Sequence, residues 1–491
     1  MSFLPITLEM SIVLALLLPL LGGLGILLAG RYPNLREGVT LTTALLLLLV
    51  VFSMIPEILA GERPELVLLE MMPGLSIRFE VEPLGMLFAC VAAFLWPINS
   101  IYSIGYMRGN KEKKQTRFYF FFVVAIFGAM GIAFAGNLVT LFLFYEVLTL
   151  STFPLVTHKG SSSMQSGRVY LGILITTSIG LLLPAIIWTW HVTGTTAFVP
   201  GGIIGDNLQG PLLVLLLFLF VYGIGKAAVM PVHRWLPAAM VAPTPVSALL
   251  HAVAVVKAGV FSVVKVVTYI FGLETLQGVA GVEWLLYAAG FTVVVASFIA
   301  LQQDNLKRRL AYSTIGQLSY VVLGVAILAP ISMVGAALHI VAHAFGKITL
   351  FFAAGAIYTA SKKTEVSQLD GIGRRMPWTM GAFAIGALSM IGVPPAVGFI
   401  SKWYILMGAF QTEQWIAIAV IIISTLLNAA YFVPIIFAAF FKPEAPGTKD
   451  HGEAPFAAVL ALSLTAAMTV LLFLFPEVPF ELAKQIGVGV P

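Results

Sequence analysis

The chain has 491 residues, of which 59% are hydrophobic and only 10% are charged. Soluble domains carry about 25% charged residues, so a water-soluble fold of this length would lack the polar surface it needs. This excludes soluble enzymes, disordered and fibrous chains, and nucleic-acid-binding proteins, since the net charge of +5 is spread along the sequence. The single cysteine, Cys90, excludes an internal disulfide framework. The composition predicts a polytopic membrane protein.

About fourteen hydrophobic stretches follow one another along the chain, most of them long enough to cross a bilayer. Backbone groups in lipid must bond within their own segment, so an all-α fold is predicted, and the alternating segments of a β-barrel do not occur. The first stretch lacks a basic region before it and is too long for a cleavable signal peptide. The predicted spans lie near 4–29, 39–59, 83–105, 118–135, 138–157, 169–190, 212–230, 244–271, 284–301, 310–328, 331–360, 378–408, 415–441 and 455–475.

Basic residues are divided unevenly between the two sides of the predicted bundle. One side holds nineteen Lys and Arg residues, and the other holds only Arg63, Arg78 and Lys484. Because cytoplasmic loops are enriched in Lys and Arg, this bias predicts that both termini lie outside. A turn at Pro73 followed by alternating apolar residues predicts a short outer hairpin within 61–82. The basic segments are 30–38, 106–117, 158–168, 231–243, 302–309, 361–377 and 442–454.

A small set of ionisable residues remains inside the predicted spans. A charged group near the middle of a bilayer costs several kcal/mol, so each of these residues is a functional candidate. The set contains five lysines, one glutamate and three histidines: Lys226, Lys257, Lys265, Lys347, Lys402, Glu146, His251, His339 and His343.

Glu146 lies about midway along its span, in the run FLFYEVLTL. A charge buried at that depth is tolerated beside an opposite charge, and Lys226 in YGIGKAAVMP is the candidate partner. The alternative interpretation is a static ion pair that only holds two helices together. That alternative weakens when the pair is one of several intramembrane charges.

Prolines interrupt two of the predicted spans beside a lysine. Pro231 follows Lys226 at a distance of five residues, and the pair Pro394 and Pro395 precedes Lys402. Two interrupted helices at corresponding positions in a transporter-like chain indicate an ion site, because the freed backbone groups must face protein or water. Ordinary proline kinks are the alternative.

The spans fall into two sets of five that follow three N-terminal spans. The fourth member of each set holds a break and a lysine, and an odd number of spans inverts the second set relative to the first. The predicted regions are 1–117 with three spans and the outer hairpin, 118–271 with the first repeat, 284–441 with the inverted repeat, and 442–491 with a loop and the last span.

The run HIVAHAFGK places His339, His343 and Lys347 on one helical face. They extend over about 12 Å along the helix axis, so single waters would connect one protonatable group to the next. Histidine suits such a relay because its charge changes near physiological pH. The alternative is a histidine that is only hydrogen-bonded within the core, and three ionisable residues in register weigh against it.

The run TPVSALLHAVAVVKAGVFSVVK contributes three more ionisable residues. His251 and Lys257 are six residues apart and are predicted to face different neighbours around their helix. Lys257 is near mid-span and is predicted to exchange protons. Lys265 lies further out and is expected to extend its ammonium group to the membrane surface.

Four stretches resemble the antiporter-like membrane subunits shared by respiratory complex I, Mrp-type cation/proton antiporters and membrane-bound hydrogenases. The second stretch is highly specific to that family, and the matches cover most of 118–410. The chain looks most like the Mrp D subunit or its hydrogenase counterpart. The stretches are FLFYEVLTLSTFPLV, GIGKAAVMPVHRWLPAAMVAPTPVSALLHAVAVVKAG, HAFGK, and LDGIGRRMPWT followed by IGVPPAVGFISKW.

The resemblance implies a fourteen-helix subunit of a prokaryotic cell membrane, assembled beside homologous and small membrane subunits. It implies that Glu146 and Lys226 act as a pair and that Lys402 is the terminal site. The residues that would link the two halves are Lys257, His251, His339, His343 and Lys347.

The residues and the resemblance together predict a subunit that translocates protons and Na⁺, with the Mrp-type Na⁺/H⁺ antiporter as the favoured class. The alternative is a proton- or sodium-pumping membrane subunit of an NADH:quinone oxidoreductase or a hydrogenase, with no redox centre of its own. A third class, a cytochrome b-like protein with histidine axial ligands, does not explain the lysines. No cofactor, metal or nucleic-acid partner is predicted, and the sequence leaves the exchanged cation and the transport direction open.

Overall fold

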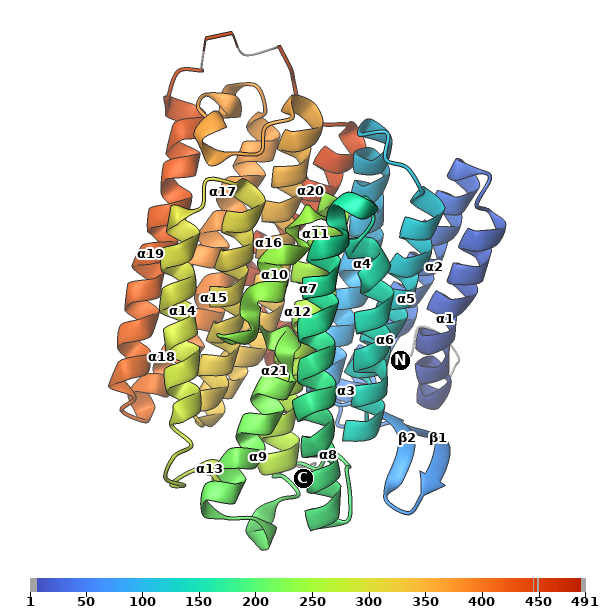
Figure 1. The fold of residues 1–491 in the computed structure, drawn as a ribbon, viewed down its shortest axis with the longest axis vertical. Coiled ribbons are helices and arrows are strands. Elements are labelled where there is room, and N and C mark those ends of the chain that lie inside the picture. Colours follow the sequence, from blue (N-terminus) through green and yellow to red (C-terminus); the bar gives the residue numbers. More distant parts are fainter. Residues whose placement is uncertain (1–6, 445, 448–449, 487–491) are drawn as a thin grey trace.

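Long helices run side by side through most of the chain in the computed structural model, which describes residues 7–444, 446–447 and 450–486 (Figure 1). The first helices are α1 (Leu8–Leu28), α2 (Pro33–Ser53), α3 (Ile55–Leu59), α4 (Pro83–Gly109), α5 (Gln115–Ala133) and α6 (Leu138–Val156). The middle of the chain contains α7 (Ser161–Thr177), α8 (Leu183–Thr193), α9 (Gly210–Gly223), α10 (Trp235–Ala238), α11 (Thr244–Ala248), α12 (Val255–Val266) and α13 (Leu273–Leu276). The remaining helices are α14 (Trp284–Gln302), α15 (Leu306–Ala326), α16 (Pro330–Ser361), α17 (Pro377–Ile391), α18 (Gly398–Gln411), α19 (Trp415–Phe441), α20 (Phe456–Leu474) and α21 (Glu477–Lys484).

Eleven helices of the described residues are long and apolar enough to cross a membrane. Their backbone groups bond within each helix, which is what a lipid environment requires. The predicted all-α membrane class is therefore confirmed. The other three predicted stretches contain α9, α15, and the pair α17 and α18, which are shorter or less apolar elements. The first residues of the stretch at 4–29 and parts of the loop at 442–454 lie outside the described residues.

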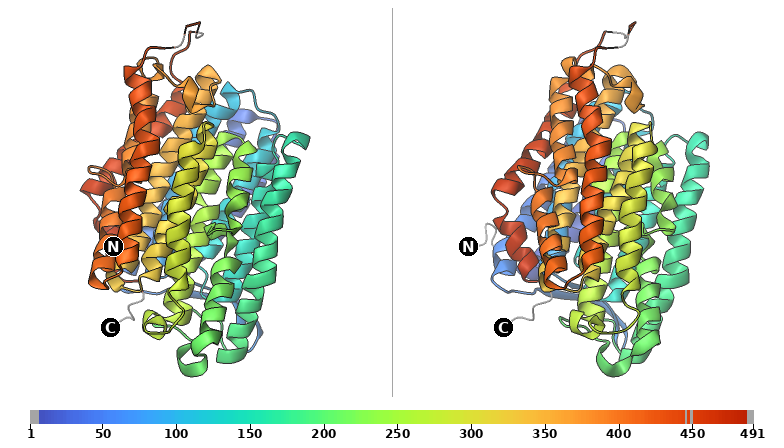
Figure 2. Two further views of the ribbon diagram at one scale, coloured as in Figure 1. Left: turned by 60° about the vertical axis from the view of Figure 1, so that its left-hand side comes forward. Right: turned by 90° about the vertical axis from the view of Figure 1, so that its left-hand side faces the viewer.

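Two helical segments form the centre of the bundle. The segment Thr244–Phe271, which contains α11 and α12, and the helix α16 are the two whose most apolar parts are wholly buried. By contrast, α1 and α20 expose many of their leucines (Leu28 is 86% exposed), as expected of helices at the periphery. Figure 2 shows that the helices stay closely aligned when the bundle is turned. Charged residues on α12 and α16 are consequently surrounded by protein.

The span that begins with α9 is interrupted in its middle. The helix ends at Gly223, a single 3₁₀ turn covers Gly225–Ala227, and Ala228 adopts a left-handed conformation with φ of 57°. The chain then resumes as the turn η4 (Val232–Arg234), α10, and the turn η5 (Ala239–Val241). The indole Nε1 of Trp235 donates to the Gly225 carbonyl oxygen at 3.0 Å, which satisfies one backbone group that the break frees.

The second interrupted span lies between α17 and α18. The helix α17 ends at Ile391, and Gly392 follows it with φ of 89°, a conformation that glycine adopts without steric cost. The residues Pro394 and Pro395 then prevent the helix from continuing, because proline lacks an N–H donor. The helix α18 begins at Gly398, so both breaks occur where the prolines of the sequence indicate them.

A two-stranded hairpin projects from one end of the bundle (Figure 1). Its strands are β1 (Glu65–Met72) and β2 (Leu75–Glu80), paired antiparallel from Glu65 opposite Glu80 to Met72 opposite Leu75. At the same end, Gln485 just after α21 accepts from Arg63 and donates to the Leu59 carbonyl oxygen. The C-terminal helix therefore ends beside the segment that leads from α3 into the hairpin.

Candidate functional site

Lys226 occupies the 3₁₀ turn of the first broken helix and is completely buried. Its Nζ donates to the Thr149 hydroxyl at 2.6 Å and to the Tyr145 carbonyl oxygen at 2.8 Å, both on α6. The same ammonium group lies 3.0 Å from the centre of the Tyr145 ring. The break thus places the lysine where oxygen dipoles and an aromatic face stabilise its charge.

Glu146 does not form the direct ion pair with Lys226 that the sequence suggests. No ion pair with any described residue is found for its carboxylate, and both carboxylate oxygens are buried without a hydrogen-bond donor among those residues. The reason is geometric: Tyr145 and Thr149, one turn apart on α6, already bind the lysine. Glu146 is the next residue along α6, so it lies about 100° around the helix from Tyr145, and the residue as a whole is partly exposed.

Lys257 and His343 form the closest contact between two of the predicted site residues. The lysine Nζ lies 2.5 Å from the histidine Nδ1, and both side chains are completely buried. This contact joins α12 to α16. His251 precedes α12, in the π-helical turn Leu249–Val253, with its ring 4.6 Å from that of Phe351. Neither ring nitrogen of His251 has a hydrogen-bond partner among the described residues.

His339 continues the chain of contacts towards the second break. Its ring lies 6.3 Å from that of His343, one turn away on α16. Its Nδ1 lies 2.8 Å from the Ser401 hydroxyl, and its Nε2 lies 3.0 Å from the Gln317 side-chain oxygen. Ser401 is the residue before Lys402 on α18, so His339 connects α16 directly to the broken helix.

Lys402 binds the backbone that the second break exposes. Its Nζ donates to the carbonyl oxygens of Met390 at 2.8 Å and Ile391 at 3.0 Å, at the end of α17. A cation is favoured there because the last carbonyls of a helix carry partial negative charge. Gln317 also donates to the Met390 carbonyl oxygen, at 3.1 Å. A Cβ atom on Gly392 would lie 2.6 Å from the Lys402 side chain, so glycine provides the space that the lysine occupies.

Lys347 lies on a side branch rather than in line with the two histidines. Its Nζ donates to the Ser313 hydroxyl at 2.7 Å and to the Leu310 carbonyl oxygen at 3.2 Å, both on α15. The Tyr431 hydroxyl donates to the same Ser313 at 2.9 Å. The sequence places Lys347 on the face of His339 and His343, but its long side chain reaches another helix.

Lys265 does not extend to the membrane surface, and that prediction is wrong. The side chain is completely buried and its Nζ lies 3.2 Å from the Glu82 carboxylate, which also accepts from the backbone N–H groups of Leu84 and Gly85. A cavity of about 190 Å³ adjoins the pair near the hairpin and is also lined by Glu80. Burial raises the pKa of Glu80, and the Arg78 guanidinium opposes that effect.

Neutral polar side chains complete the site, and a search for charges alone does not find them. Thr149, Gln317 and Ser401 each hold one of the predicted residues through a hydrogen bond. The signal in the sequence is weak, since hydroxyls and amides are common in membrane helices and bond to their own helix as well. Glu82 precedes the predicted span at 83–105, so a search for charges within the spans does not find the partner of Lys265 either.

The described residues contain no group of three or more His, Cys, Asp or Glu side chains arranged to hold a metal ion. Proton exchange is the chemistry that the arrangement offers. The contacts run from Lys257 through His343 and His339 to Ser401, the residue before Lys402, with one imidazole-to-imidazole step that exceeds hydrogen-bond length.

Comparison with known proteins places these residues in a family. Residues 135–428, more than half of the chain, match the family model "NADH:quinone oxidoreductase/Mrp antiporter, TM". The N subunit of the NADH-quinone oxidoreductase of Desulforudis audaxviator is 32% identical over 404 residues, which are 81% of this chain and 80% of that protein. The D subunit of the Na⁺/H⁺ antiporter of Alkalihalophilus pseudofirmus is 27% identical over 382 residues, 77% of this chain and 76% of its own length.

A solved structure shares the whole fold. A chain of the Mrp complex from Dietzia sp. superposes with a TM-score of 0.88 at 21% identity, covering 99% of this chain and 98% of that one. The superposition therefore extends to the regions outside the family model. The resemblance inferred from the four sequence stretches is confirmed, and the chain belongs to the membrane-spanning NADH:quinone oxidoreductase/Mrp antiporter family.

Proposed function

We propose that the chain is an ion-translocating subunit of a multisubunit membrane complex and that protons move along the buried line from Lys226 to Lys402. The observation that carries the proposal is the contact of Lys257 with His343 at 2.5 Å, continued by the 2.8 Å contact of His339 with Ser401. Isolated ionisable groups in a membrane interior are expensive. A series of them between two broken helices has a direct use in ion transfer.

The transfer uses the two nitrogens of each imidazole. His343 accepts a proton from the Lys257 ammonium group at Nδ1 and releases one from Nε2, which has no partner among the described residues. The rings of His343 and His339 are 6.3 Å apart, a gap that one water molecule spans. His339 then passes a proton through the Ser401 hydroxyl to the neighbourhood of Lys402, and Lys347 exchanges protons from its side branch.

Glu146 and Lys226 form the entry to this line in our proposal, coupled through space rather than by a direct bond. The buried carboxylate oxygens of Glu146 belong to a partly exposed residue of α6. A cation that approaches this face from a neighbouring protein of the complex stabilises the carboxylate. The same cation reduces the electrostatic stabilisation that Glu146 gives to the Lys226 ammonium group. Lys226 then releases a proton towards Lys257, with His251 beside the route.

The architecture supports a division into two inverted halves. We propose fourteen membrane crossings, with α5 to α12 and α14 to α19 as two five-span repeats, each with one broken helix that holds a lysine. An inverted pair of half-channels opens to opposite sides of the membrane, as in other transporters with such repeats. With both termini outside, the loops rich in Lys and Arg face the cytoplasm of a prokaryotic cell.

The favoured class is a Mrp-type Na⁺/H⁺ antiporter subunit, which the similarity to the D subunit of such an antiporter supports. The second candidate is the membrane subunit of a redox-driven pump, which the 32% identity to the N subunit of an NADH-quinone oxidoreductase supports. Purification from native membranes separates the two. Co-purifying flavin and Fe–S subunits favour the redox class, and antiporter subunits without them favour the Mrp class.

The test of translocation compares Lys257→Ala and Lys402→Ala with the wild-type complex in inside-out membrane vesicles. We expect both variants to abolish cation-dependent or redox-dependent pH changes while the subunit still co-purifies with its partners. Lys113→Ala, at an exposed position in the loop between α4 and α5, is the matched control and keeps wild-type transport. Wild-type transport in an assembled Lys402→Ala complex contradicts the proposal.

A further inference from the structure

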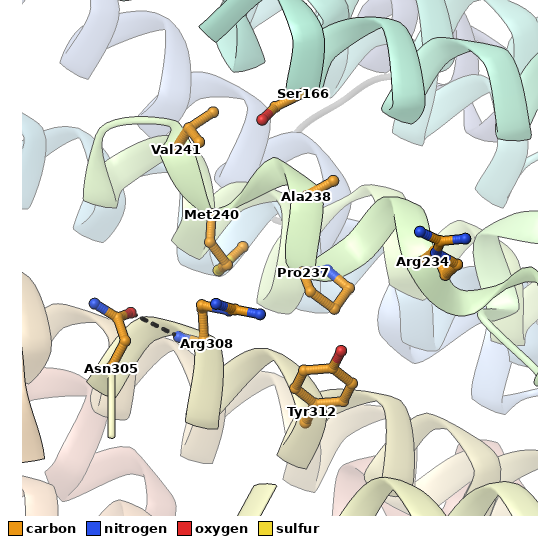
Figure 3. Close-up of a pocket in the computed structure, with 9 residues that line it drawn as sticks. All are labelled: Ser166, Arg234, Pro237, Ala238, Met240, Val241, Asn305, Arg308 and Tyr312. Carbon is orange, nitrogen blue, oxygen red and sulfur yellow. Dashed lines mark hydrogen bonds between the residues drawn. The ribbon is translucent and has the colours of Figure 1, made fainter. Parts of the chain in front are cut away.

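A groove of about 500 Å³ lies along the inner half of the first broken helix (Figure 3). Its walls come from α7, from the turns and helix between Val232 and Val241, and from the first turns of α15. In Figure 1 the short helix α10 lies between α7 and α15, so the groove is formed by segments far apart in the sequence. The loops that hold its residues belong to the side of the bundle that is rich in Lys and Arg.

Two arginines face this groove without a partner. The guanidinium groups of Arg234 and Arg308 both line it, and neither forms a hydrogen bond or an ion pair with any described residue (Figure 3). Ser166 and Tyr312 add hydroxyl groups to the same walls. No acidic side chain lines the groove among the described residues, so these positive charges are uncompensated by the protein.

A second cavity, which shares Met240 and Val241 of the turn η5 with the groove, is also lined by basic residues. It measures about 180 Å³ and is lined by Lys159, Lys307 and Lys363, again without an acidic residue among the described ones. The nearby Asp304 is bound elsewhere, since it accepts from Ser367 at 2.7 and 2.9 Å. Five basic residues therefore line two cavities beside one short turn, and no acidic residue among the described ones lines either cavity.

The role of basic residues in orienting a membrane protein does not by itself account for this arrangement. Basic residues that only orient the chain need to lie on the inner side and to be solvated. Arg234 and Arg308 are exposed and meet that requirement, but they also line one concave surface that contains hydroxyl groups. Two unpaired guanidiniums that line the same hollow suit an oxyanion, because the planar fork of arginine matches the oxygens of a phosphate.

We propose that this groove binds the phosphate headgroup of an anionic phospholipid from the inner leaflet. Basic pockets between membrane helices on the cytoplasmic side are suited to such headgroups. The lining of the groove contains apolar side chains, among them Met240, and Val169 on α7 is 39% exposed one turn from Ser166. The phosphate lies between Arg234 and Arg308, and an acyl chain follows the apolar side of α7.

The bound lipid strengthens the inner half of the broken helix. The segment from Val232 to Val241 consists of short turns with few helical hydrogen bonds of its own. A headgroup held by Arg234 on this segment and by Arg308 on α15 connects the two across the groove. The inference depends on the membrane location of the chain and not on the proposed route of protons.

The experiment measures thermal unfolding of the purified full-length protein through its eight tryptophans in detergent, with added phosphatidylglycerol, phosphatidylcholine or inorganic phosphate. We expect phosphatidylglycerol to raise the unfolding temperature and the other two to leave it unchanged. In the double variant Arg234→Gln with Arg308→Gln, the concentration of phosphatidylglycerol for half of the effect rises at least about tenfold. Native mass spectrometry counts the lipid that stays bound.

The control removes two other inner-side arginines, as Arg31→Gln with Arg374→Gln, which are exposed and outside the groove. If phosphatidylglycerol binding weakens as much in this control as in the groove variant, net charge rather than the groove binds the lipid. That result overturns the proposal. If inorganic phosphate raises the unfolding temperature as much as phosphatidylglycerol does, the groove binds a soluble anion, and the proposal is overturned as well. If the double arginine variant does not fold, Ser166→Trp fills the groove with both guanidiniums intact and must weaken lipid binding to the same degree.

Discussion

The buried lysines differ in how their charge is stabilised. Lys226, Lys347 and Lys402 donate to carbonyl and hydroxyl oxygens, and Lys257 contacts a histidine nitrogen, whereas Lys265 has a carboxylate partner in Glu82. A dipole stabilises an ammonium group less than a full countercharge does. The lysines without an ion pair therefore depend on dipoles alone, whereas Lys265 has a full countercharge beside it.

Ser401 is the residue at which this argument is most easily tested. Its hydroxyl lies 2.8 Å from His339 Nδ1 and donates to the Gly398 carbonyl oxygen, so it fixes the ring between α16 and α18. Replacing it by alanine removes one buried hydrogen bond, worth about 1 kcal/mol. We expect Ser401→Ala to slow proton transfer roughly five- to tenfold in vesicles, with normal assembly.

A matched serine provides the control for this prediction. Ser262 on α12 is equally buried, but its hydroxyl donates only to the Ala258 carbonyl oxygen of its own helix. Ser262→Ala should therefore transport at the wild-type rate. Equal rates for the two variants would mean that the Ser401 hydroxyl has no part in the relay.

At the scale of helices, proline positions in the sequence already indicate where the two spans break. The sequence does not reveal which groups bind the lysine at each break, because that depends on which neighbouring helix supplies the oxygen atoms. Glu146 illustrates the limit: it has the right charge and depth, yet Tyr145 and Thr149 bind Lys226 instead. Lys265 illustrates it again, since its partner Glu82 is 183 residues away. The charged candidates were predictable, whereas the uncharged residues that orient them were not.

The ion pair between Lys265 and Glu82 joins α12 to the start of α4, and we predict that it is structural. Glu82 is 6% exposed, so Lys265→Ala leaves a buried carboxylate without its cation, a loss of about 3 kcal/mol in the free energy of unfolding. Thermal unfolding in detergent measures the change. Adding Glu82→Gln to the variant should restore part of the stability, since the uncompensated charge is gone.

The exposed ion pair between Lys484 and Glu481 on α21 provides a comparison. Their side chains are 46% and 49% exposed, and pairs of that kind contribute at most about 1 kcal/mol. Lys484→Ala should therefore leave the unfolding temperature nearly unchanged. A loss as large as that of Lys265→Ala would show that removal of any lysine destabilises the bundle.

The contact between Asp304 and Ser367 connects the loop before α15 to the loop after α16, and we predict that it is lost in acid. Hydrogen bonds from the Ser367 hydroxyl and amide lower the pKa of Asp304 below its ordinary value. A carboxylate whose pKa is lowered by folding stabilises the fold above its unfolded-state pKa of about 3.9, and this contribution disappears as the pH falls through the folded-state value. Hydrogen exchange of the segment 362–370, corrected for intrinsic rates, follows the opening.

The substitution Ser367→Ala removes the shorter of these hydrogen bonds and leaves the amide. The pKa of Asp304 then moves back towards its ordinary value, so opening in acid begins at a higher pH than in the wild type. Ser367→Thr keeps the hydroxyl donor and should behave like the wild type. If the pH midpoint of loop opening is the same in Ser367→Ala as in the wild type, Asp304 does not control this loop contact.

At the scale of the whole molecule, one hydrogen-bond contact between predicted site residues joins the two halves of the chain. Lys257 belongs to α12, in the first set of spans, and His343 belongs to α16, in the second set. Both helices are at the buried centre of the bundle, so this junction is shielded from lipid. The polar residues follow one another across the interior, whereas the surface helices α1 and α20 contribute none of the site residues.

The orientation of the whole bundle follows from its loops, and we predict that the hairpin lies outside the cell. The hairpin end holds few basic residues, and the opposite end holds the segments rich in Lys and Arg.

Cys90 is the only cysteine, so a Cys90→Ser background permits single-site labelling. Leu68→Cys, at a position 66% exposed on β1, should react with a membrane-impermeant maleimide in intact cells. Lys113→Cys, exposed between α4 and α5, should react only after the membrane is opened. The reverse pattern would invert the bundle and place both termini in the cytoplasm.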